Sequence, residues 1–304
     1  MGSRGSAPRV AIVVLSWNGR DDTLMCLRSL RAVEHEPLDV IVVDNGSTDG
    51  TDDAVRAEFR EVDLVRCEEN LGFAGGSNVG IACALERGAD HVLLLNNDVE
   101  VEPDFVGPLV EEAERRSDAG ALCSKILFFK ARDRIWFVGA RFDPRRAYGR
   151  HIRFRHLDDP AETTVSETDR ACGAAMLVPR AVLEQVGDFD RELFVYAEDI
   201  DWSLRARAAG LHHYVVPRSR IYHKVSVSSG GENMPTQPYY GTRNTLVVCE
   251  RWAPLGRLGT WRRRAVVVAA NAAKALTSPK RRESLLAVRE GWRDFRRGRL
   301  GKRP

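Results

Sequence analysis

Short β-branched runs alternate with helical patterns over the first hundred residues, and this alternation constrains the fold more than any other feature. The strand-like runs are VAIVVLS at 10–16, DVIVVDN at 39–45, VDLVR at 62–66 and HVLLLNND at 91–98. Apolar residues recur at helical spacing between them, as with Leu24, Leu27 and Leu30. Strands joined by helices pair in parallel, because a parallel connection needs a crossover. We therefore expect an α/β fold with a mostly parallel central sheet flanked by helices.

Polar residues directly follow three of these strands. Trp17 and Asn18 come after the first, Asp44 and Asn45 close the second, and 96–98 close the fourth. In open parallel sheets, ligands bind beyond the carboxyl ends of the strands. The sequence therefore predicts a ligand site at this edge of the sheet.

A glycine-rich segment, NLGFAGGSN at 70–78, precedes a helical pattern at 79–87. We expect this segment to be a loop that leads into the helix. It matches neither the GxGxxG pattern of dinucleotide-binding folds nor the GxxxxGK[ST] pattern of phosphate-binding loops. The segment therefore argues against a dinucleotide enzyme and against a P-loop nucleotide triphosphatase.

Asp98 stands where a hard cation could bind. Mg²⁺ or Mn²⁺ needs only one or two protein carboxylates when phosphate oxygens complete its coordination shell. His223, in a late strand-like segment, could add an imidazole ligand to the same ion. Both residues also have a structural interpretation. Asp favours turns, and a single histidine is often a hydrogen-bonded residue of the core.

Further acidic positions also have two interpretations. Asp44 could accept a hydrogen bond from the imide N–H of a uracil or thymine ring, or belong to a helix cap. Glu198 and Asp199 open a helical pattern, where a carboxylate could serve as a base or complement the helix dipole. We assign Asp201 to structure, because Arg205 follows it by four residues. Asp199, and after it Glu198, are the candidates for chemistry.

The C-terminal part of the chain is strongly basic. Residues 251–304 hold 16 Lys and Arg against 3 Asp and Glu, whereas residues 1–250 hold 30 against 40. A basic tail on an acidic body indicates an anionic contact. We expect peripheral contact with an anionic membrane rather than specific nucleic-acid binding, through a stripe of Trp252, Leu255, Leu258 and Trp261. The alternative is a helix packed on the body with solvated charges.

No feature of the sequence calls for a disulfide, a structural metal or a membrane span. The six cysteines show no CxxC spacing, so we expect reduced thiols. No secretory leader precedes the first strand, and no uninterrupted apolar stretch reaches the roughly 18 residues of a spanning helix. We expect a cytoplasmic protein, which the basic tail can bring to the inner face of the cell membrane.

Together these segments resemble the family 2 glycosyltransferases of the GT-A fold, and within them the bacterial rhamnosyltransferase-like branch. The matching stretches, which run in the family's order over about 8–250, are VAIVVLSWNGRDDTLMCLRSL, VIVVDNGSTDGT, NLGFAGGSNVGI, VLLLNNDVEVEPDF, GAAMLVPRAVLEQVGDFDRELFVYAEDIDWSLRARAAG and YHKVSVSSG. The resemblance implies a Rossmann-like, mostly parallel sheet flanked by helices. We divide the chain into a catalytic domain at 8–236, with a nucleotide-binding half at about 8–100 and an acceptor and catalytic half at 101–236, and a helical basic extension at 237–304.

The resemblance also implies roles for single residues. The positions that would contact the nucleotide sugar are Trp17, Asn18, Asp44, Asn78, Asn97, Gly173 and Ala174. Asp98 would bind the metal as the last residue of a DxD-type motif, which here begins with Asn96, and His223 would be a further ligand. Asparagine at that first position is familiar in the rhamnosyltransferase-like branch. Asp199 would be the catalytic base, with Glu198 as the other member of the pair.

The activity implied is an inverting, metal-dependent transfer of a sugar from a nucleoside diphosphate to a hydroxyl. The resemblance favours dTDP-rhamnose as the donor, followed by UDP-hexoses, and a glycan, lipid-linked or small-molecule acceptor. A catalytically degenerate GT-A module that binds nucleotide sugar or glycan without turnover is the alternative. The intact Glu198-Asp199 pair argues against that alternative, whereas Asn96 leaves room for it. A sugar-nucleotide pyrophosphorylase is disfavoured, since WNGRDD stands where such enzymes carry a glycine-rich segment with nearby basic residues.

Overall fold

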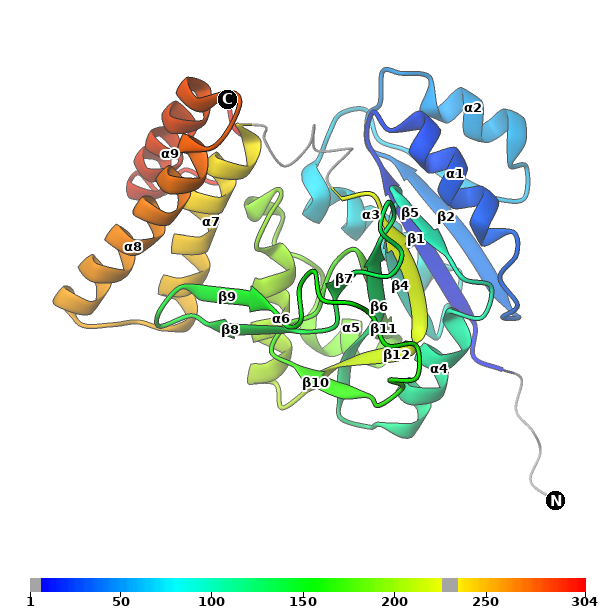
Figure 1. Ribbon diagram of the computed structural model, residues 1–304. Coiled ribbons are helices and arrows are strands. Elements are labelled where there is room, and N and C mark those ends of the chain that lie inside the picture. Colours follow the sequence, from blue (N-terminus) through cyan, green and yellow to red (C-terminus); the bar gives the residue numbers. More distant parts are fainter. Residues whose placement is uncertain (1–6, 226–234) are drawn as a thin grey trace.

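The N-terminal half of the chain forms alternating strands and helices, as the sequence predicts (Figure 1). The computed structural model describes residues 7–225 and 235–304, so the last part of the YHKVSVSSG stretch lies outside the described residues. The elements are β1 (Val10–Ser16), α1 (Arg20–Leu30), β2 (Leu38–Asp44), α2 (Thr51–Glu58), β3 (Asp63–Arg66), α3 (Gly72–Glu86) and β4 (His91–Asn96). β1 pairs in parallel with β2 and β4, and β2 pairs in parallel with β3.

The following segment extends the same sheet and adds a separate hairpin. Its elements are β5 (Val99–Val101), α4 (Val106–Arg115), β6 (Ala119–Phe128), β7 (Ile135–Phe137), β8 (Ala140–Asp143), β9 (Tyr148–His151), β10 (Ser166–Thr168), β11 (Ala175–Pro179), α5 (Arg180–Val186), the 3-10 turn η1 (Arg191–Leu193), α6 (Glu198–Ala208) and β12 (His212–His223). Among the described residues the strand order is β10-β12-β6-β11-β4-β1-β2-β3, with β5 on β12 and β7 on β6. Parallel pairs predominate along this order, and β11 is antiparallel to both neighbours. The predicted mostly parallel α/β sheet is therefore confirmed.

The glycine-rich segment is not the loop that we expect from the sequence, because most of it is the first part of α3. A Cβ atom on Gly80 would lie 2.2 Å from Val13 Cγ1, and one on Gly76 would lie 2.5 Å from Leu15 Cδ1. Missing side chains at these two positions let α3 lie directly on β1. This close packing offsets the low helix propensity of glycine. The spacing of Gly76 and Gly80, four residues apart, is the sequence signal that could have predicted this helix.

The C-terminal segment forms three helices beside the sheet domain (Figure 1). They are α7 (Thr236–Trp252), α8 (Arg257–Leu276) and α9 (Arg281–Arg296). α7 contacts α6 and both other helices, and its Val248 packs with Leu193 and Ala197 in a small buried cluster. Within 7–225 and 235–304, no helix is both long and apolar enough to span a bilayer. The first helix of the extension is thus packed on the sheet domain.

The apolar stripe predicted in the tail is not one surface. Trp252 is half-buried and its indole N–H donates a hydrogen bond to Asp201 in the sheet domain. Leu258 and Trp261 are 74% and 68% exposed on α8. α7 ends at Trp252 and α8 begins at Arg257, so these residues do not share one helix. The prediction that Trp252 belongs to the same apolar stripe was therefore wrong.

Candidate functional site

The carboxyl ends of β1, β2 and β4 adjoin at one edge of the sheet. Ser16 lies opposite Asp44, and Leu15 lies opposite Asn96. Asn97 fastens these ends together, since its amide donates to Thr23 Oγ1 at 3.0 Å and to Ser16 Oγ at 3.4 Å. Its side chain is buried and turned toward the strands. The clustering predicted from the polar residues that follow the strands is therefore present.

Asp44 is a fully buried carboxylate with one oxygen available to a donor. Its Oδ1 accepts a hydrogen bond from Ser47 N at 3.0 Å, as expected for the start of a turn. Its Oδ2 has no hydrogen-bond partner within the described residues, and Arg66 Nε lies 3.8 Å from it. A buried acceptor without a donor calls for an explanation. A ligand that supplies an N–H group would provide one.

Trp17 and Asn18 form the turn after β1. Their side chains differ in environment, because Trp17 is partly exposed and Asn18 is hydrogen-bonded to the next loop. Trp17 is 39% exposed, so its ring is available for stacking. Asn18 has a positive φ of 49°, donates its N–H to Ser47 Oγ at 3.0 Å, and accepts from Thr48 N at 2.8 Å. Asn18 therefore joins the loops that follow β1 and β2, next to Asp44.

Asn78 lies on α3 and is engaged with a backbone peptide far along the chain. Its amide donates to Phe189 O at 2.8 Å, and its carbonyl accepts from Phe189 N at 2.9 Å. The side chain is 2% exposed. In this conformation Asn78 ties the loop after α5 to α3, and the sugar-phosphate role expected from the sequence stays a prediction.

Asp98 and His223 meet although 125 positions separate them along the chain. Asp98 follows β4 and His223 ends β12, where the latter pairs with Val99. His223 Nε2 lies 3.0 Å from Asp98 Oδ1 and 3.4 Å from the amide nitrogen of Asn96. The two side chains are nearly buried, and the Lys224 N–H donates to the Asp98 carbonyl at 2.9 Å. The structure thus brings together the two residues predicted as metal ligands.

The donor set at Asp98 and His223 fits a divalent cation that shares its coordination shell with phosphate. No group of three or more His, Cys, Asp or Glu residues gathers in the part of the chain that the structure describes. A carboxylate oxygen and an imidazole nitrogen within hydrogen-bonding distance are ligands that Mn²⁺ accepts, and a diphosphate can supply further oxygens. A dedicated all-protein metal cage does not fit these residues.

Glu198 and Asp199 open α6 and differ in environment. Asp199 Oδ2 lies 3.1 Å from Arg170 Nη1 and accepts a hydrogen bond from Gly173 N at 3.4 Å. Glu198 is 6% exposed, and its Oε2 has no hydrogen-bond partner among the residues described. Burial, and secondarily the neighbouring Asp199 charge, raise the pKa of Glu198 well above its ordinary value. Of the two carboxylates, Asp199 is the one that pairs with the guanidinium of Arg170.

Arg170 and His151 support Asp199 but belong to no sequence motif, and the sequence analysis did not identify them. Arg170 Nη2 donates to His151 Nε2 at 2.8 Å, so Nδ1 of that imidazole is the protonated nitrogen and donates to Trp136 O at 2.9 Å. Burial and the Arg170 charge lower the pKa of His151 to about 4. The imidazole is therefore neutral near pH 7 and keeps the guanidinium directed at Asp199.

Gly173 and Ala174 connect the two halves of the site. The Ala174 carbonyl accepts from Asn96 N at 3.1 Å, beside the Asp98–His223 pair. Gly173 donates to Asp199, and a Cβ on it would lie 3.0 Å from Phe73 Cζ. Trp136 adds a second connection, with its ring edge-on to His223 at 4.7 Å and to His151 at 5.1 Å. The candidate metal ligands and the candidate base thus share one continuous site.

The C-terminal extension holds the loop that leads into Glu198. Tyr196 and Ala197 have positive φ angles of 66° and 73°, which non-glycine residues adopt rarely. The Asn244 amide nitrogen on α7 lies 2.7 Å from Tyr196 O, 2.9 Å from Val195 O and 2.7 Å from Leu193 O. Contacts from α7 therefore maintain a backbone conformation that α6 alone would not impose.

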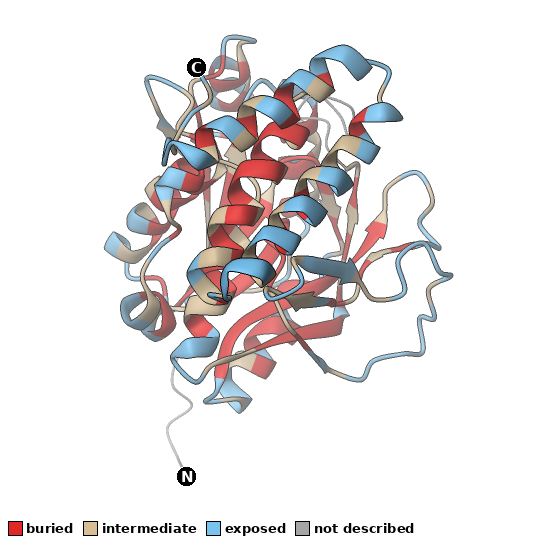
Figure 2. Ribbon diagram, turned by 90° about the vertical axis from the view of Figure 1, so that its left-hand side faces the viewer, coloured by how far each residue is buried: buried red, intermediate tan, exposed pale blue. Residues whose placement is uncertain are grey.

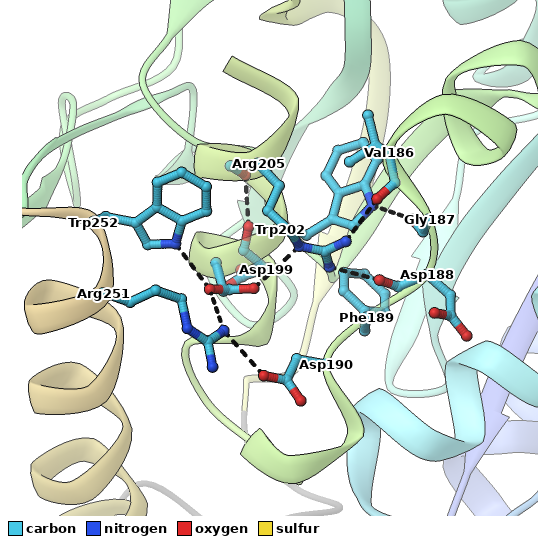
Figure 3. Close-up of polar contacts among 12 residues, drawn as sticks. Val186, Gly187, Asp188, Phe189, Asp190, Asp199, Trp202, Arg205, Arg251 and Trp252 are labelled. Atoms are coloured by element: carbon cyan, nitrogen blue, oxygen red, sulfur yellow. Dashed lines mark hydrogen bonds and ion pairs between the residues drawn. The ribbon is translucent and has the colours of Figure 1, made fainter. Parts of the chain in front are cut away.

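Asp201 also connects α6 to α7, and its predicted pairing with Arg205 is confirmed. The fully buried carboxylate accepts from Arg205 at 3.2 Å, as the i,i+4 spacing predicts. It also accepts from Arg251 Nη1 at 2.8 Å and from Trp252 Nε1 at 2.9 Å, both on α7. Arg205 in turn donates to Val186 O at the end of α5, and Trp202 donates to Gly187 O directly after it (Figure 3).

Comparison with known proteins places these features in a family. The model of the family described as Glycosyl transferase family 2 matches residues 11–186. The N-acetylglucosaminyl-diphospho-decaprenol L-rhamnosyltransferase of Mycobacterium tuberculosis is 31% identical over 225 residues, 67% of this chain and 72% of that protein. The dTDP-rhamnosyl transferase RfbF of Shigella flexneri is 24% identical over 248 residues, 79% of each chain.

Solved structures share the fold at low sequence identity. GalNAc-T7 with UDP, GalNAc and Mn²⁺ superposes with a TM-score of 0.65 at 13% identity, over 96% of this chain. The chain spans 56% of that longer protein. The mannosyltransferase PcManGT of Pyrobaculum calidifontis, in complex with GDP-Man and Mn²⁺, gives 0.56 at 17% identity, over 95% of this chain and 87% of the other. Both proteins were solved with Mn²⁺ present.

Proposed function

The chain belongs to glycosyltransferase family 2, and from this premise we propose that it inverts the anomeric carbon of a sugar as it moves that sugar from a nucleoside diphosphate to a hydroxyl. The observation that carries the proposal is the continuity of the site. The Asp98–His223 pair adjoins Asn96, whose N–H reaches Ala174, and the neighbouring Gly173 reaches Asp199. A leaving diphosphate and an attacking hydroxyl need one contiguous site of this kind.

The nucleoside is proposed to bind over the ends of β1 and β2. The buried Asp44 Oδ2 can accept the imide N–H of uracil or thymine, and the exposed Trp17 ring can stack on a base. Asn18 keeps the two loops joined. This preference for a pyrimidine agrees with the name of the Shigella flexneri relative, a dTDP-rhamnosyl transferase.

Asp98 and His223 are proposed to hold Mg²⁺ or Mn²⁺, and two neighbouring residues, Trp136 and Asn96, keep these ligands in place. A bound divalent cation supplies charge neutralisation for the diphosphate, an effect that is larger in the transition state than in the ground state. Trp136 packs edge-on against the His223 ring at 4.7 Å and limits its rotation. Asn96 lies beside the same imidazole nitrogen.

Asp199 is proposed to be the catalytic base. In a single displacement, the acceptor oxygen bonds to the anomeric carbon as the bond from that carbon to the diphosphate oxygen breaks. Asp199 takes the acceptor proton. Glu198 is the second choice for this step, because its side chain is buried and burial raises its pKa, which favours the protonated carboxyl. Arg170, directed by His151, is proposed to position Asp199.

Rhamnose is the favoured sugar and a UDP-hexose is second, on the basis of two relatives named as rhamnosyltransferases. We propose a hydroxyl of a glycan or of a lipid-linked sugar as the acceptor, since the Mycobacterium tuberculosis relative is named for a diphospho-decaprenol substrate. Polysaccharide biosynthesis is then the proposed context.

Thermal unfolding with nucleotides tests the donor site without knowledge of the acceptor. The protein is heated with UDP, dTDP or GDP, each with and without Mn²⁺ or Mg²⁺. A ligand at 100 times its dissociation constant raises the unfolding free energy by about 2.7 kcal/mol. We expect a shift for a pyrimidine diphosphate that needs the metal. If no nucleotide shifts the transition, the donor site is absent; if nucleotides bind but no sugar donor is ever consumed, a non-catalytic module is the better description.

A further inference from the structure

The outward face of α8 is apolar along almost its whole length. Seven apolar residues on this face are exposed, and they are Leu258, Trp261, Ala265, Val266, Ala269, Ala273 and Leu276. The large side chains among them are strongly exposed, at 74% for Leu258, 68% for Trp261 and 54% for Val266. Figure 2 looks onto this side of the molecule, with exposed turns along its outer helices. We call this set the α8 face.

The polarity of α8 differs from that of a helix that merely covers a domain. Such a helix turns its apolar stripe inward and its charges outward. In α8, Arg263 is buried and donates to Ala253 O at 2.6 Å and Pro144 O at 3.2 Å, and Arg264 pairs with Glu250 at 2.6 Å. Two arginines of α8 therefore point inward, and the apolar face has no covering element among the described residues.

Basic side chains surround the α8 face. Arg262 lies within it and Arg257 begins the helix, while Arg281 and Arg282 follow its end at the start of α9. All four are exposed, and none pairs with an acidic side chain in the described parts of the chain. They belong to the segment 251–304, where basic residues outnumber acidic ones 16 to 3. The face is thus mostly apolar, with one arginine within it and further arginines at its ends.

We propose that the α8 face docks the protein on an anionic phospholipid surface. Apolar and tryptophan side chains enter the boundary between headgroups and acyl chains, while arginines beside them bind lipid phosphates. A second copy of the chain is a poorer occupant, because a two-fold contact would place the same unpaired arginines opposite one another. The helix lies in the plane of the surface and does not cross it.

Vesicle co-sedimentation tests this docking with the full chain. Phosphatidylcholine vesicles with and without phosphatidylglycerol are compared at low and high salt. We expect binding only to the anionic vesicles, weaker at high salt. Trp261→Glu combined with Val266→Glu should weaken binding by about tenfold or more, because apolar burial is lost and negative charge added. Leu157→Glu is the matched control, since Leu157 is 56% exposed on the sheet domain and its variant should bind as the parent does.

Three results would overturn the proposal. They are no binding of the parent to anionic vesicles at low salt, equal binding by the doubly substituted variant, and a parent dimer in sedimentation velocity that the same variant abolishes. The last result would assign the α8 face to a second copy. The nucleotide-dependent thermal shift should be the same in parent and variant, which shows that the variant is folded. Docking does not depend on the proposed transfer reaction, so either can fail alone.

Discussion

The amide nitrogen of Asn244 lies 2.7 Å from the carbonyl oxygen of Tyr196, two positions before the Glu198-Asp199 pair. Asn244 belongs to α7, in the basic extension, whereas Tyr196 belongs to the loop that delivers the proposed base. The extension therefore takes part in shaping the site. We therefore expect the stability and the activity of each part to depend on the other.

Replacing Asn244 by Leu should lower both stability and turnover. The variant removes the donor shared by three backbone carbonyls, and the loss should cost about 2–4 kcal/mol of unfolding free energy. Urea unfolding measures the cost, and turnover of folded protein measures the displacement of Asp199. Asn271→Leu on α8 is the matched control, because its amide reaches only Val267 O within its own helix. An Asn244 variant with normal turnover would show that the loop holds its conformation unaided.

Asp199→Asn should cut kcat by roughly a hundredfold or more, because the acceptor proton then has no base. Nucleotide affinity should stay nearly unchanged, since Asp199 is not expected to contact the nucleoside. Isothermal calorimetry with dTDP or UDP and steady-state assays measure the two quantities. Asp188→Asn, at a side chain 53% exposed on the loop after α5, is the control. If nucleotide affinity falls in step with kcat, Asp199 is a binding residue instead.

Asp98→Asn should weaken the metal-dependent part of nucleotide binding. The variant keeps a side chain of similar shape within reach of His223 but removes the anionic oxygen that a divalent cation prefers. The thermal shift produced by nucleotide with Mn²⁺ should shrink toward the shift with nucleotide alone. Asp104→Asn, an exposed acid before α4, is the control. An unchanged metal response in the Asp98 variant would remove this residue from the metal site.

Arg170→Gln should lower kcat by about tenfold while the KM for the donor changes little. The variant removes the guanidinium that lies 3.1 Å from Asp199, so the carboxylate loses its fixed orientation. Arg141→Gln, an exposed arginine paired with Asp169, serves as the comparison. A pure rise in KM would instead indicate that Arg170 binds the donor.

Glu198→Gln should become more stable relative to the parent as the pH rises. The pKa of Glu198 is raised in the folded protein, so the folded state keeps a proton that the unfolded chain loses above its ordinary value of 4.5. The parent's unfolding free energy therefore falls with increasing pH in that range. The neutral glutamine does not titrate. Melting temperatures from about pH 5 to about pH 8 should diverge in favour of the variant, and a constant difference would mean that Glu198 is not protonated in the fold.

Much of the fold could be predicted because its signal is local. A run such as Val10–Ser16 indicates a buried strand by itself, and alternation with helical segments dictates a parallel sheet. The same logic predicted that Asp44 and Asp98 lie at one edge, since parallel strands end together. The helical conformation of the glycine-rich segment was not predictable in this way, because it depends on close contact of Gly76 and Gly80 with β1.

The remaining part of the site could not be predicted because its contacts cross long stretches of chain. Arg170, His151 and Asn244 belong to no motif, and their spacing from Asp199 says nothing about distance in space. Their positions follow from how β9, the segment before β11, and α7 pack around α6. The raised pKa of Glu198 likewise arises from burial, which is a property of packing.

The family, the alternation of strands and helices, and the acidic side chains at the strand ends could all be inferred from the sequence, since strand periodicity and motif order depend on neighbouring residues. Tertiary structure alone decided which acid is held by a cation, which face of α8 is left uncovered, and which residues of the extension support the loop before Asp199. These outcomes depend on burial and on contacts between distant segments, and no local pattern encodes either.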